Sequence, residues 1–177
     1  MHREFLINEL PKNSIGAEIG VWKGEFAKHL NENVKPKTFY LVDPWEFMSK
    51  HPDRWYGGSA AKNQNDMDDI YQNVISMFEN DSNVKILKTY SDNLPEHVGD
   101  GELDWIYIDG NHSYEFVLRD LYLSYKLVKE GGLITGDDFA NNNDIDRALK
   151  TFLNDMGDKV SLQTIKNRQF IVKIDKK

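Results

Sequence analysis

Short apolar runs alternate along this chain with longer stretches in which apolar residues recur at helical spacing. The clearest case lies between Asp104 and Phe139, where two strand-like runs, Trp105 to Ile108 and Leu133 to Thr135, flank a segment of helical period. The glycine pair Gly131-Gly132 is expected to end that helix. A strand, a helix and a second strand in this order predict two parallel strands joined by a right-handed crossover.

The first half of the chain predicts a second unit of the same kind. Ile15 to Val21 is a compact apolar run with nearby glycines, Glu25 to Asn33 has helical spacing, and Thr38 to Val42 is rich in β-forming residues. A further helix is expected over Asp68 to Phe78 and a further strand over Val84 to Leu87. Strands and helices that alternate in this way are typical of an α/β fold.

The C-terminal part predicts a helix followed by a hairpin. Apolar residues recur at i, i+3, i+4 and i+7 from Ile145 onward, and Asn142 or Asn143 is the expected cap. Val160 to Ile165 and Phe170 to Ile174 are strand-like, and only three residues separate them, so they should pair antiparallel. Residues 1–177 are therefore expected to form one α/β domain.

Residues 46–67 interrupt this alternation. The segment has no clean period, and it is long for a loop in a compact α/β domain. It is either a surface excursion that packs its own aromatics or a lid over a binding site. We favour the lid because the segment follows the end of a strand and, with Trp45, carries Trp55 and Tyr56, which are suited to stacking on a ring but also to packing in a core.

Composition excludes several classes of protein. The 177 residues include no cysteine, so neither a disulfide framework nor a thiolate zinc site is available, and a reducing, cytoplasmic environment is expected. The net charge of −7 makes nucleic acid an improbable partner. No apolar run has the length of a signal-peptide core or a membrane span, so no membrane partner is expected.

The turn after the first predicted strand has the chemistry of a nucleoside site. Gly20 and Gly24 allow a ligand to lie against the backbone, but the dinucleotide pattern G-x-G-x-x-G is absent. Glu18 would repel a pyrophosphate and suit a ligand that carries an ammonium group. Asp43 ends the next strand, where a carboxylate can accept hydrogen bonds from ribose hydroxyls. The alternatives are an ordinary turn with a solvated glutamate and a turn aspartate before Pro44.

Three more carboxylates follow the strands of the opening unit. Asp109, Asp137 and Asp138 offer only hard oxygen donors, which suit Mg²⁺, or else Mn²⁺ or Ca²⁺. Without a cation between them these acids would repel each other, which favours a bound ion. His112 is the candidate general base because an imidazole changes charge near neutral pH. The alternatives are helix-capping acids and a surface histidine.

Four motifs in order carry a family resemblance: AEIGVWKG, LVDPW, DWIYIDGNHSY and GGLITGDDF. Together they resemble the class I S-adenosylmethionine (SAM)-dependent methyltransferases, and most of all the small-molecule O-methyltransferases that act on macrolide and related sugars. The resemblance spans about Ile15 to Ile174. It implies a Rossmann-like three-layer sandwich with a seven-stranded, mostly parallel sheet whose last strand is antiparallel. One departure is Trp22, at a position that is often glycine in the wider superfamily.

The resemblance also assigns roles to residues. The methionine end of SAM is expected near Glu18, the ribose on Asp43 and the adenine near Tyr90-Ser91-Asp92. The full sets predicted are, for the cofactor, Glu18, Gly20, Gly24, Asp43, Ser91 and Asp109; for catalysis, His112 and Asp109; and for the metal, Asp109, Asp137 and Asp138.

The sequence thus predicts a SAM-dependent O-methyltransferase that acts on a small hydroxylated substrate, a sugar or a natural-product ring, with help from a divalent metal. One alternative is a protein similar to cephalosporin hydroxylases, with iron on His112, Asp109 and Asp137. Another is a non-catalytic cofactor-binding module or subunit. Because few residues precede the first strand, the pocket would be open, roofed by residues 46–67, or completed by a second protomer in a homodimer.

Overall fold

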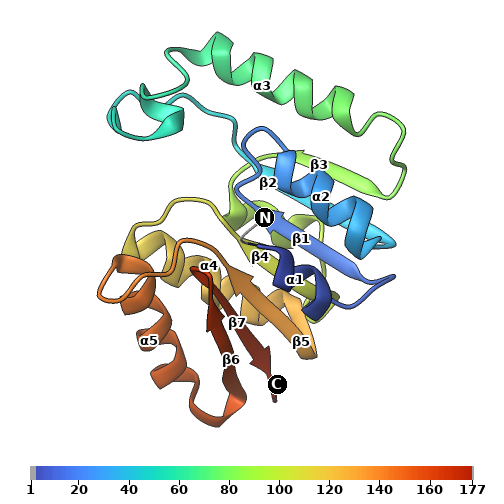
Figure 1. Cartoon of the computed structure of the whole chain (residues 1–177), viewed down its shortest axis with the longest axis vertical. Helices are drawn as coiled ribbons and strands as arrows, with labels where there is room; N and C mark the ends of the chain where they lie inside the picture. The colour runs from blue at the N-terminus through green and yellow to red at the C-terminus, as the bar shows by residue number, and fades with distance from the viewer. Residues whose placement is uncertain (1–2, 177) are drawn as a thin grey trace.

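A computed structural model describes residues 3–176 of the chain, and the strands in this part form one seven-stranded sheet (Figure 1). Its order is β3-β2-β1-β4-β5-β7-β6. The strands are β1 (Ile15–Ile19), β2 (Thr38–Asp43), β3 (Val84–Lys88), β4 (Leu103–Ile108), β5 (Val128–Gly136), β6 (Val160–Lys166) and β7 (Gln169–Ile174). Strands β1 to β5 are parallel, and β7 runs antiparallel to both β5 and β6. The predicted α/β, Rossmann-like sheet with an antiparallel last strand is confirmed.

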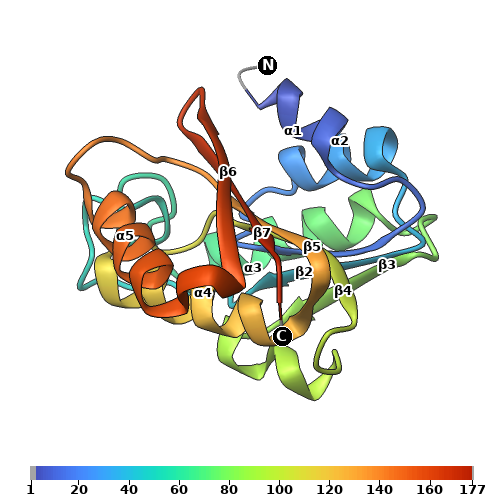
Figure 2. The same ribbon diagram turned by 90° about the horizontal axis from the view of Figure 1, so that it is seen from below.

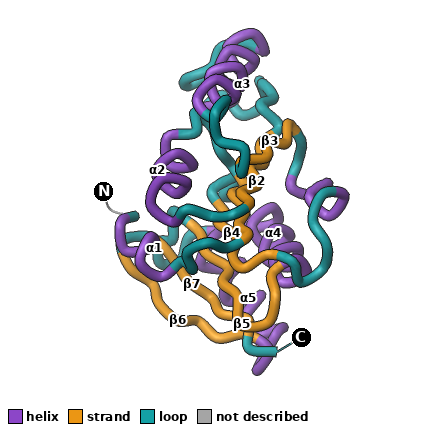
Figure 3. The backbone as a smooth tube through the Cα atoms, turned by 90° about the vertical axis from the view of Figure 1, so that its right-hand side faces the viewer, coloured by secondary structure: helices purple, strands orange, loops and turns teal. Residues whose placement is uncertain are grey.

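Helices cover both faces of the sheet (Figure 3). They are α1 (Glu4–Glu9), α2 (Glu25–Val34), α3 (Gln64–Met77), α4 (Tyr114–Leu127) and α5 (Asp144–Met156), with short 3₁₀ turns at Trp55–Gly57, Ser91–Glu96 and Gly157–Lys159. Strand β4 shows why three layers form. Trp105 and Tyr107 pack among α1, α2 and α3, whereas Ile106 and Ile108 pack among α4 and α5. Successive strand residues point to opposite faces, so a strand that is apolar throughout contributes side chains to the hydrophobic core on each face of the sheet.

The register of the central strands gathers their carboxyl ends at one edge. Ile19 at the end of β1 lies opposite Val42 of β2 and Ile108 of β4. The next residue along each strand therefore emerges at the same place, which puts Gly20, Asp43 and Asp109 side by side. This edge is where open α/β sheets bind ligands.

Helix α5 begins as its sequence predicts. The Asn143 side chain accepts a hydrogen bond from the backbone N–H of Asp146 at 2.9 Å, so Asn143 is the cap. Such a cap contributes about 1 kcal/mol to the free energy of unfolding.

Two boundaries differ from the prediction by more than a residue or two. Gly131 and Gly132 do not end α4; they lie inside β5, which already starts at Val128. Fully buried Val128 pairs with Leu103, and the register then shifts before Trp105, an irregularity that the glycine pair accommodates. Helix α3 starts at residue 64 rather than 68, because the Asn63 side chain caps it.

The β6–β7 hairpin reaches back to the start of the chain. Figure 2 shows its tip beside α1, and Lys166 Nζ lies 5.6 Å from the Phe5 ring centroid. The carbonyl of Arg168 accepts a hydrogen bond from Phe139 N–H at 2.9 Å, which holds the tip against the turn after β5. Within residues 3–176 we find no helix with the length and apolar character needed to span a bilayer.

Candidate active site

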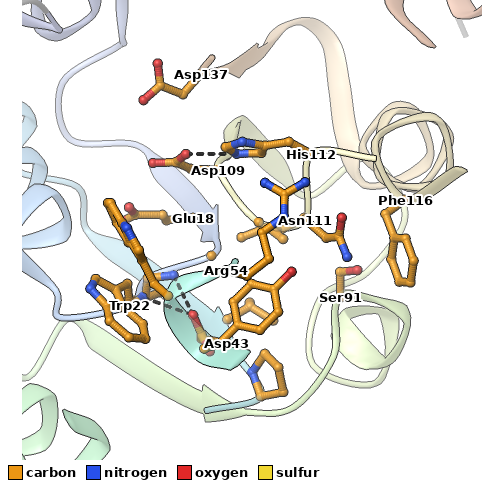
Figure 4. A pocket seen from close by; sticks show the side chains of 18 of the residues that line it. Glu18, Trp22, Asp43, Arg54, Ser91, Asp109, Asn111, His112, Phe116 and Asp137 are labelled. Carbon is orange, nitrogen blue, oxygen red and sulfur yellow. Dashed lines mark hydrogen bonds and ion pairs between the residues drawn. The ribbon is translucent and has the colours of Figure 1, made fainter. Parts of the chain in front are cut away.

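A cavity of about 1090 Å³ opens at the carboxyl edge of the sheet. The turns after β1, β2, β4 and β5 line it, together with the segment 46–67 and the tip of the β6–β7 hairpin. Ligand pockets typically measure roughly 300–1,000 Å³. This cavity therefore has room for a nucleoside cofactor and a second small molecule (Figure 4).

Gly20 lets the backbone approach this cavity closely. Its φ is +89°, and a Cβ at this position would overlap the carbonyl oxygen of Asp109. Both the positive φ and this overlap therefore exclude a side chain at position 20. Gly24, which was also predicted to contact the cofactor, does not line the cavity; it packs against Val74 and Met77 of α3.

Glu18 is a buried carboxylate with an unused oxygen. It is 1% exposed, lines the cavity, and its Oε2 has no hydrogen-bond partner in the described part of the chain. Burial, and after it the charge of Asp109, raises the pKa of Glu18 well above its ordinary value. A buried polar atom without a partner is costly. This carboxylate is therefore suited to a ligand that brings a cation.

Asp43 is largely committed to the backbone. Its Oδ2 accepts from the N–H groups of Val21 and Trp22, both at 3.0 Å, and its Oδ1 accepts from Trp45 N–H at 2.8 Å. Burial raises the pKa of Asp43, and the three backbone hydrogen bonds oppose that shift. Since a carboxylate has about four acceptor positions, roughly one remains for a ribose hydroxyl rather than two.

Ser91 also lines the cavity, at the start of the 3₁₀ turn after β3. Its hydroxyl donates to Asp120 Oδ1 of α4 at 2.6 Å. Asp120 is 2% exposed, and burial raises its pKa to about 6. The sequence reasoning missed Asp120, because a single acid inside a helix gives no signal of its depth.

The expected metal ligands are already paired with cations of the chain. Arg3 Nη1 lies 2.9 Å from Asp109 Oδ2, and its Nη2 pairs with Asp137 Oδ2. Asp137 Oδ1 also accepts from the Gln169 amide and from Asp138 N–H. Burial raises the pKa of Asp109, and contacts with His112 and Arg3 oppose that shift.

His112 lies between two carboxylates. Its Nδ1 is 3.1 Å from Asp138 Oδ2, and its Nε2 is 3.4 Å from Asp109 Oδ1 without a well-formed hydrogen bond (Figure 4). Asp138 is held in turn by Arg168, whose Nη2 lies 2.8 Å from Asp138 Oδ1. A carboxylate on Nδ1 orients the imidazole, as in other acid–base pairs, and Nε2 then faces Asp109.

These residues do not fit a divalent metal as they are arranged. Among residues 3–176, no group of three or more His, Cys, Asp or Glu side chains is placed to hold an ion. Asp109, Asp137 and Asp138 lie at the predicted edge, but Arg3 and Arg168 offset two of their three negative charges. Repulsion between these acids is therefore relieved largely by the chain itself, and this applies both to the predicted magnesium ligands and to the alternative iron ligands His112, Asp109 and Asp137.

The segment 46–67 forms a wall of the cavity. The ring of exposed Trp55 lies 5.7 Å from that of Trp22, at an angle of 38° between planes, and both residues line the cavity. Trp45, expected as a stacking residue, is fully buried instead; its Nε1 donates to the Trp22 carbonyl, and its ring packs against Tyr71. Trp22, the departure from the superfamily pattern, thus joins the aromatic wall.

Sequence reasoning missed the two arginines and Gln169. Arg3 precedes the first helix, and Arg168 and Gln169 belong to the hairpin tip and the start of β7, so nothing local links them to the carboxylates. The one available signal was the predicted hairpin, because pairing of β7 with β5 brings residues 168–169 beside Asp137 and Asp138.

Comparison with known proteins identifies the family. A methyltransferase domain family matches residues 17–139. The chain belongs to this methyltransferase family. The predicted resemblance to class I SAM-dependent methyltransferases is confirmed, as is the prediction that the protein is an enzyme.

Individual relatives are more distant. An uncharacterized protein of Acanthamoeba polyphaga mimivirus is 29% identical over 146 residues, which cover 77% of this chain and 57% of that protein. This chain therefore spans little more than half the length of that relative. The O-methyltransferase NovP has a TM-score of 0.66 at 19% identity, covering 98% of this chain and 76% of NovP. A Streptococcus mutans protein in complex with SAH has a TM-score of 0.62 at 13% identity, covering 96% and 92%. These structures share the fold.

Proposed function

We propose that this methyltransferase binds SAM along the turns after β1, β2 and β3 and transfers its methyl group to a hydroxyl of a small, ring-containing molecule. The observation that carries the proposal is Glu18. A buried carboxylate with an unpartnered oxygen, facing a cavity beside a glycine turn, is the expected receptor for the ammonium of the methionine moiety.

The other contacts follow the length of the cofactor. Gly20 leaves room for the methionine backbone, the remaining acceptor position of Asp43 suits one ribose hydroxyl, and the turn at Ser91 faces the adenine. Two of the solved structures with this fold are named as complexes with SAM or SAH, which supports the same cofactor here.

The acceptor is expected at the opposite end, between His112 and the aromatic wall of Trp22 and Trp55. Bound SAM supplies an electrophilic methyl: the acceptor oxygen bonds to it as the sulfur–methyl bond breaks, and the electron pair stays on sulfur. His112 Nε2 takes the hydroxyl proton, while Asp138 on Nδ1 stabilises the imidazolium. The aromatic wall supports a sugar or natural-product ring, because such rings stack on indole faces. Asp109, beside His112, completes the catalytic pair.

The proposed methyl transfer does not use magnesium, because the carboxylates that would hold the ion are paired with arginine. The segment 46–67 supplies Trp55 to the aromatic wall and is proposed to close over the bound acceptor.

Isothermal titration calorimetry with SAM and with SAH tests the proposal. Both are expected to bind at one site per chain, and the absence of binding at millimolar ligand would refute it. A panel of hydroxylated ring compounds, assayed by SAH release, then tests the acceptor class. His112→Asn should abolish SAH release and leave the affinity for SAM unchanged, whereas equal loss from His97→Asn, a control at a histidine outside the cavity, would point to a general effect.

A further inference from the structure

One guanidinium spans the ends of two neighbouring strands. Arg3 Nη1 lies 2.9 Å from Asp109, at the end of β4, and Nη2 pairs with Asp137, which follows β5. The two aspartate side chains are only 17% and 1% exposed. This is a cation placed between two largely buried carboxylates, which is the position expected of a divalent ion that joins the same strand ends.

Arg3 is fixed in this position by packing. Helix α1 directly follows it, with Leu6 and Ile7 in the core. The guanidinium carbon lies 4.7 Å from the centroid of the Phe26 ring and 5.8 Å from that of Tyr107. Planar stacking on aromatic faces suits a guanidinium and removes part of its hydration. The contact therefore differs from a loose surface ion pair.

The carboxylate of Asp137 has little capacity left for a metal. Its Oδ2 pairs with Arg3, and its Oδ1 accepts from the Gln169 amide and from Asp138 N–H at 2.7 Å. Gln169 is fully buried and accepts in turn from the Tyr107 hydroxyl at 2.9 Å. An ion at this point would have to displace donors that the fold itself supplies.

We propose that Arg3 is an internal substitute for a divalent metal, which pairs with both Asp109 and Asp137, offsets one of their two negative charges and fixes Asp109 beside His112. Arg3 is thus a positioning residue: it acts on the acceptor site through Asp109. The consequence, methyl transfer without a metal ion, rests on the proposed function. The location of the cation does not, and it is tested separately.

Binding of Mn²⁺, followed by electron paramagnetic resonance of the free ion, is the direct test. After EDTA treatment and desalting, the wild-type protein should bind no Mn²⁺ at this site at millimolar concentration. Arg3→Met should create one site, at least tenfold tighter than any binding by the wild type, because it leaves two carboxylates uncompensated. Arg3→Met combined with Asp137→Asn should lose it. Lys23→Met is the matched control, since Lys23 lines the same cavity but forms no ion pair with these acids in the described region.

Tight Mn²⁺ binding by the wild type would overturn the proposal, and so would an Arg3→Met protein that gains none. A gain of binding in the Lys23 variant equal to that in the Arg3 variant would also overturn it, since total charge would then be the cause. Circular dichroism checks folding, and Arg3→Gln provides the same test should Arg3→Met not fold. SAM calorimetry on the same samples keeps the two proposals apart: the Mn²⁺ pattern without SAM binding would support the role of Arg3 and refute the proposed function.

Discussion

Glu18→Gln should weaken SAM binding and at the same time stabilise the free protein. The substitution keeps the size of the side chain and removes the charge that we assign to the ammonium contact. Hydrogen bonds to charged groups contribute about 1.5–3 kcal/mol, so the dissociation constant for SAM should rise about 10- to 100-fold. Glu25→Gln is the control, because Glu25 also lines the cavity but is exposed.

The gain in stability follows from the same carboxylate. Burial and the neighbouring Asp109 and Asp43 raise the pKa of Glu18 above its value in the unfolded chain. The folded protein therefore holds this proton more tightly, and its stability falls as pH rises from the unfolded pKa towards the folded one. Glu18→Gln removes this slope and should raise the melting temperature at pH 7. Each kcal/mol recovered corresponds to about 2–4 °C for a domain of this size.

Calorimetry at pH 5.5 and 7.0 and thermal melts at the same two values measure both effects. In the wild type, the increase in melting temperature caused by SAM should be larger at pH 7.0, where Glu18 is more often ionised. Unchanged SAM affinity in Glu18→Gln would refute the ammonium assignment. A lower melting temperature for the free variant at pH 7 would refute the claim that the carboxylate is unsatisfied.

Three further predictions concern single positions. Gly20→Ala should lower the melting temperature by about 5 °C or more, because a side chain there overlaps the carbonyl of Asp109 at a φ of +89°; an unchanged melt would contradict this. Trp55→Ala should leave SAM affinity and stability nearly unchanged, since the ring is exposed, but should raise the KM of a ring acceptor once one is found; a changed SAM affinity with an unchanged KM would count against the aromatic wall. Burial raises the pKa of Asp120 to about 6, so the contribution of Asp120 should make the wild type less stable as the pH rises from about 4 to about 6. Asp120→Asn should therefore gain more in melting temperature at pH 7 than at pH 4, and equal gains would contradict the argument.

Local patterns were sufficient for most of the fold. The β6–β7 hairpin is an example: three polar residues between two apolar runs predict antiparallel pairing. The turn that forms has two residues, Asn167 and Arg168, with the positive φ values of 52° and 65° that such a tight turn needs. The glycine pair at 131–132 was harder, because glycines can end a helix or occupy an irregular strand with equal ease. Pairing with Leu103, a non-local contact, decided between the two.

The site was only half predictable for a related reason. Strand ends are local features, so Glu18, Asp43, Asp109, Asp137 and Asp138 could all be placed at one edge. The arginines that pair with Asp109, Asp137 and Asp138 come from distant parts of the sequence. Arg3, for example, lies 106 positions from Asp109. The sequence favours a metal because three acids at one edge would repel each other, and only the folded chain shows that Arg3 and Arg168 converge on these acids.

Charge is compensated differently at two neighbouring places in the cavity, and this difference connects the two proposals. Around His112, arginines offset most of the charge of the carboxylates, so a neutral hydroxyl compound can enter without adding buried charge. Beside them, Glu18 keeps an oxygen without a partner in the described part of the chain, although Arg3 is near enough to lower the pKa of Glu18. A fold that pairs three acids and leaves the fourth unsatisfied pays a desolvation penalty at that one place. The penalty is recovered when a ligand brings its own cation, so the geometry favours a positively charged donor and a neutral acceptor bound together.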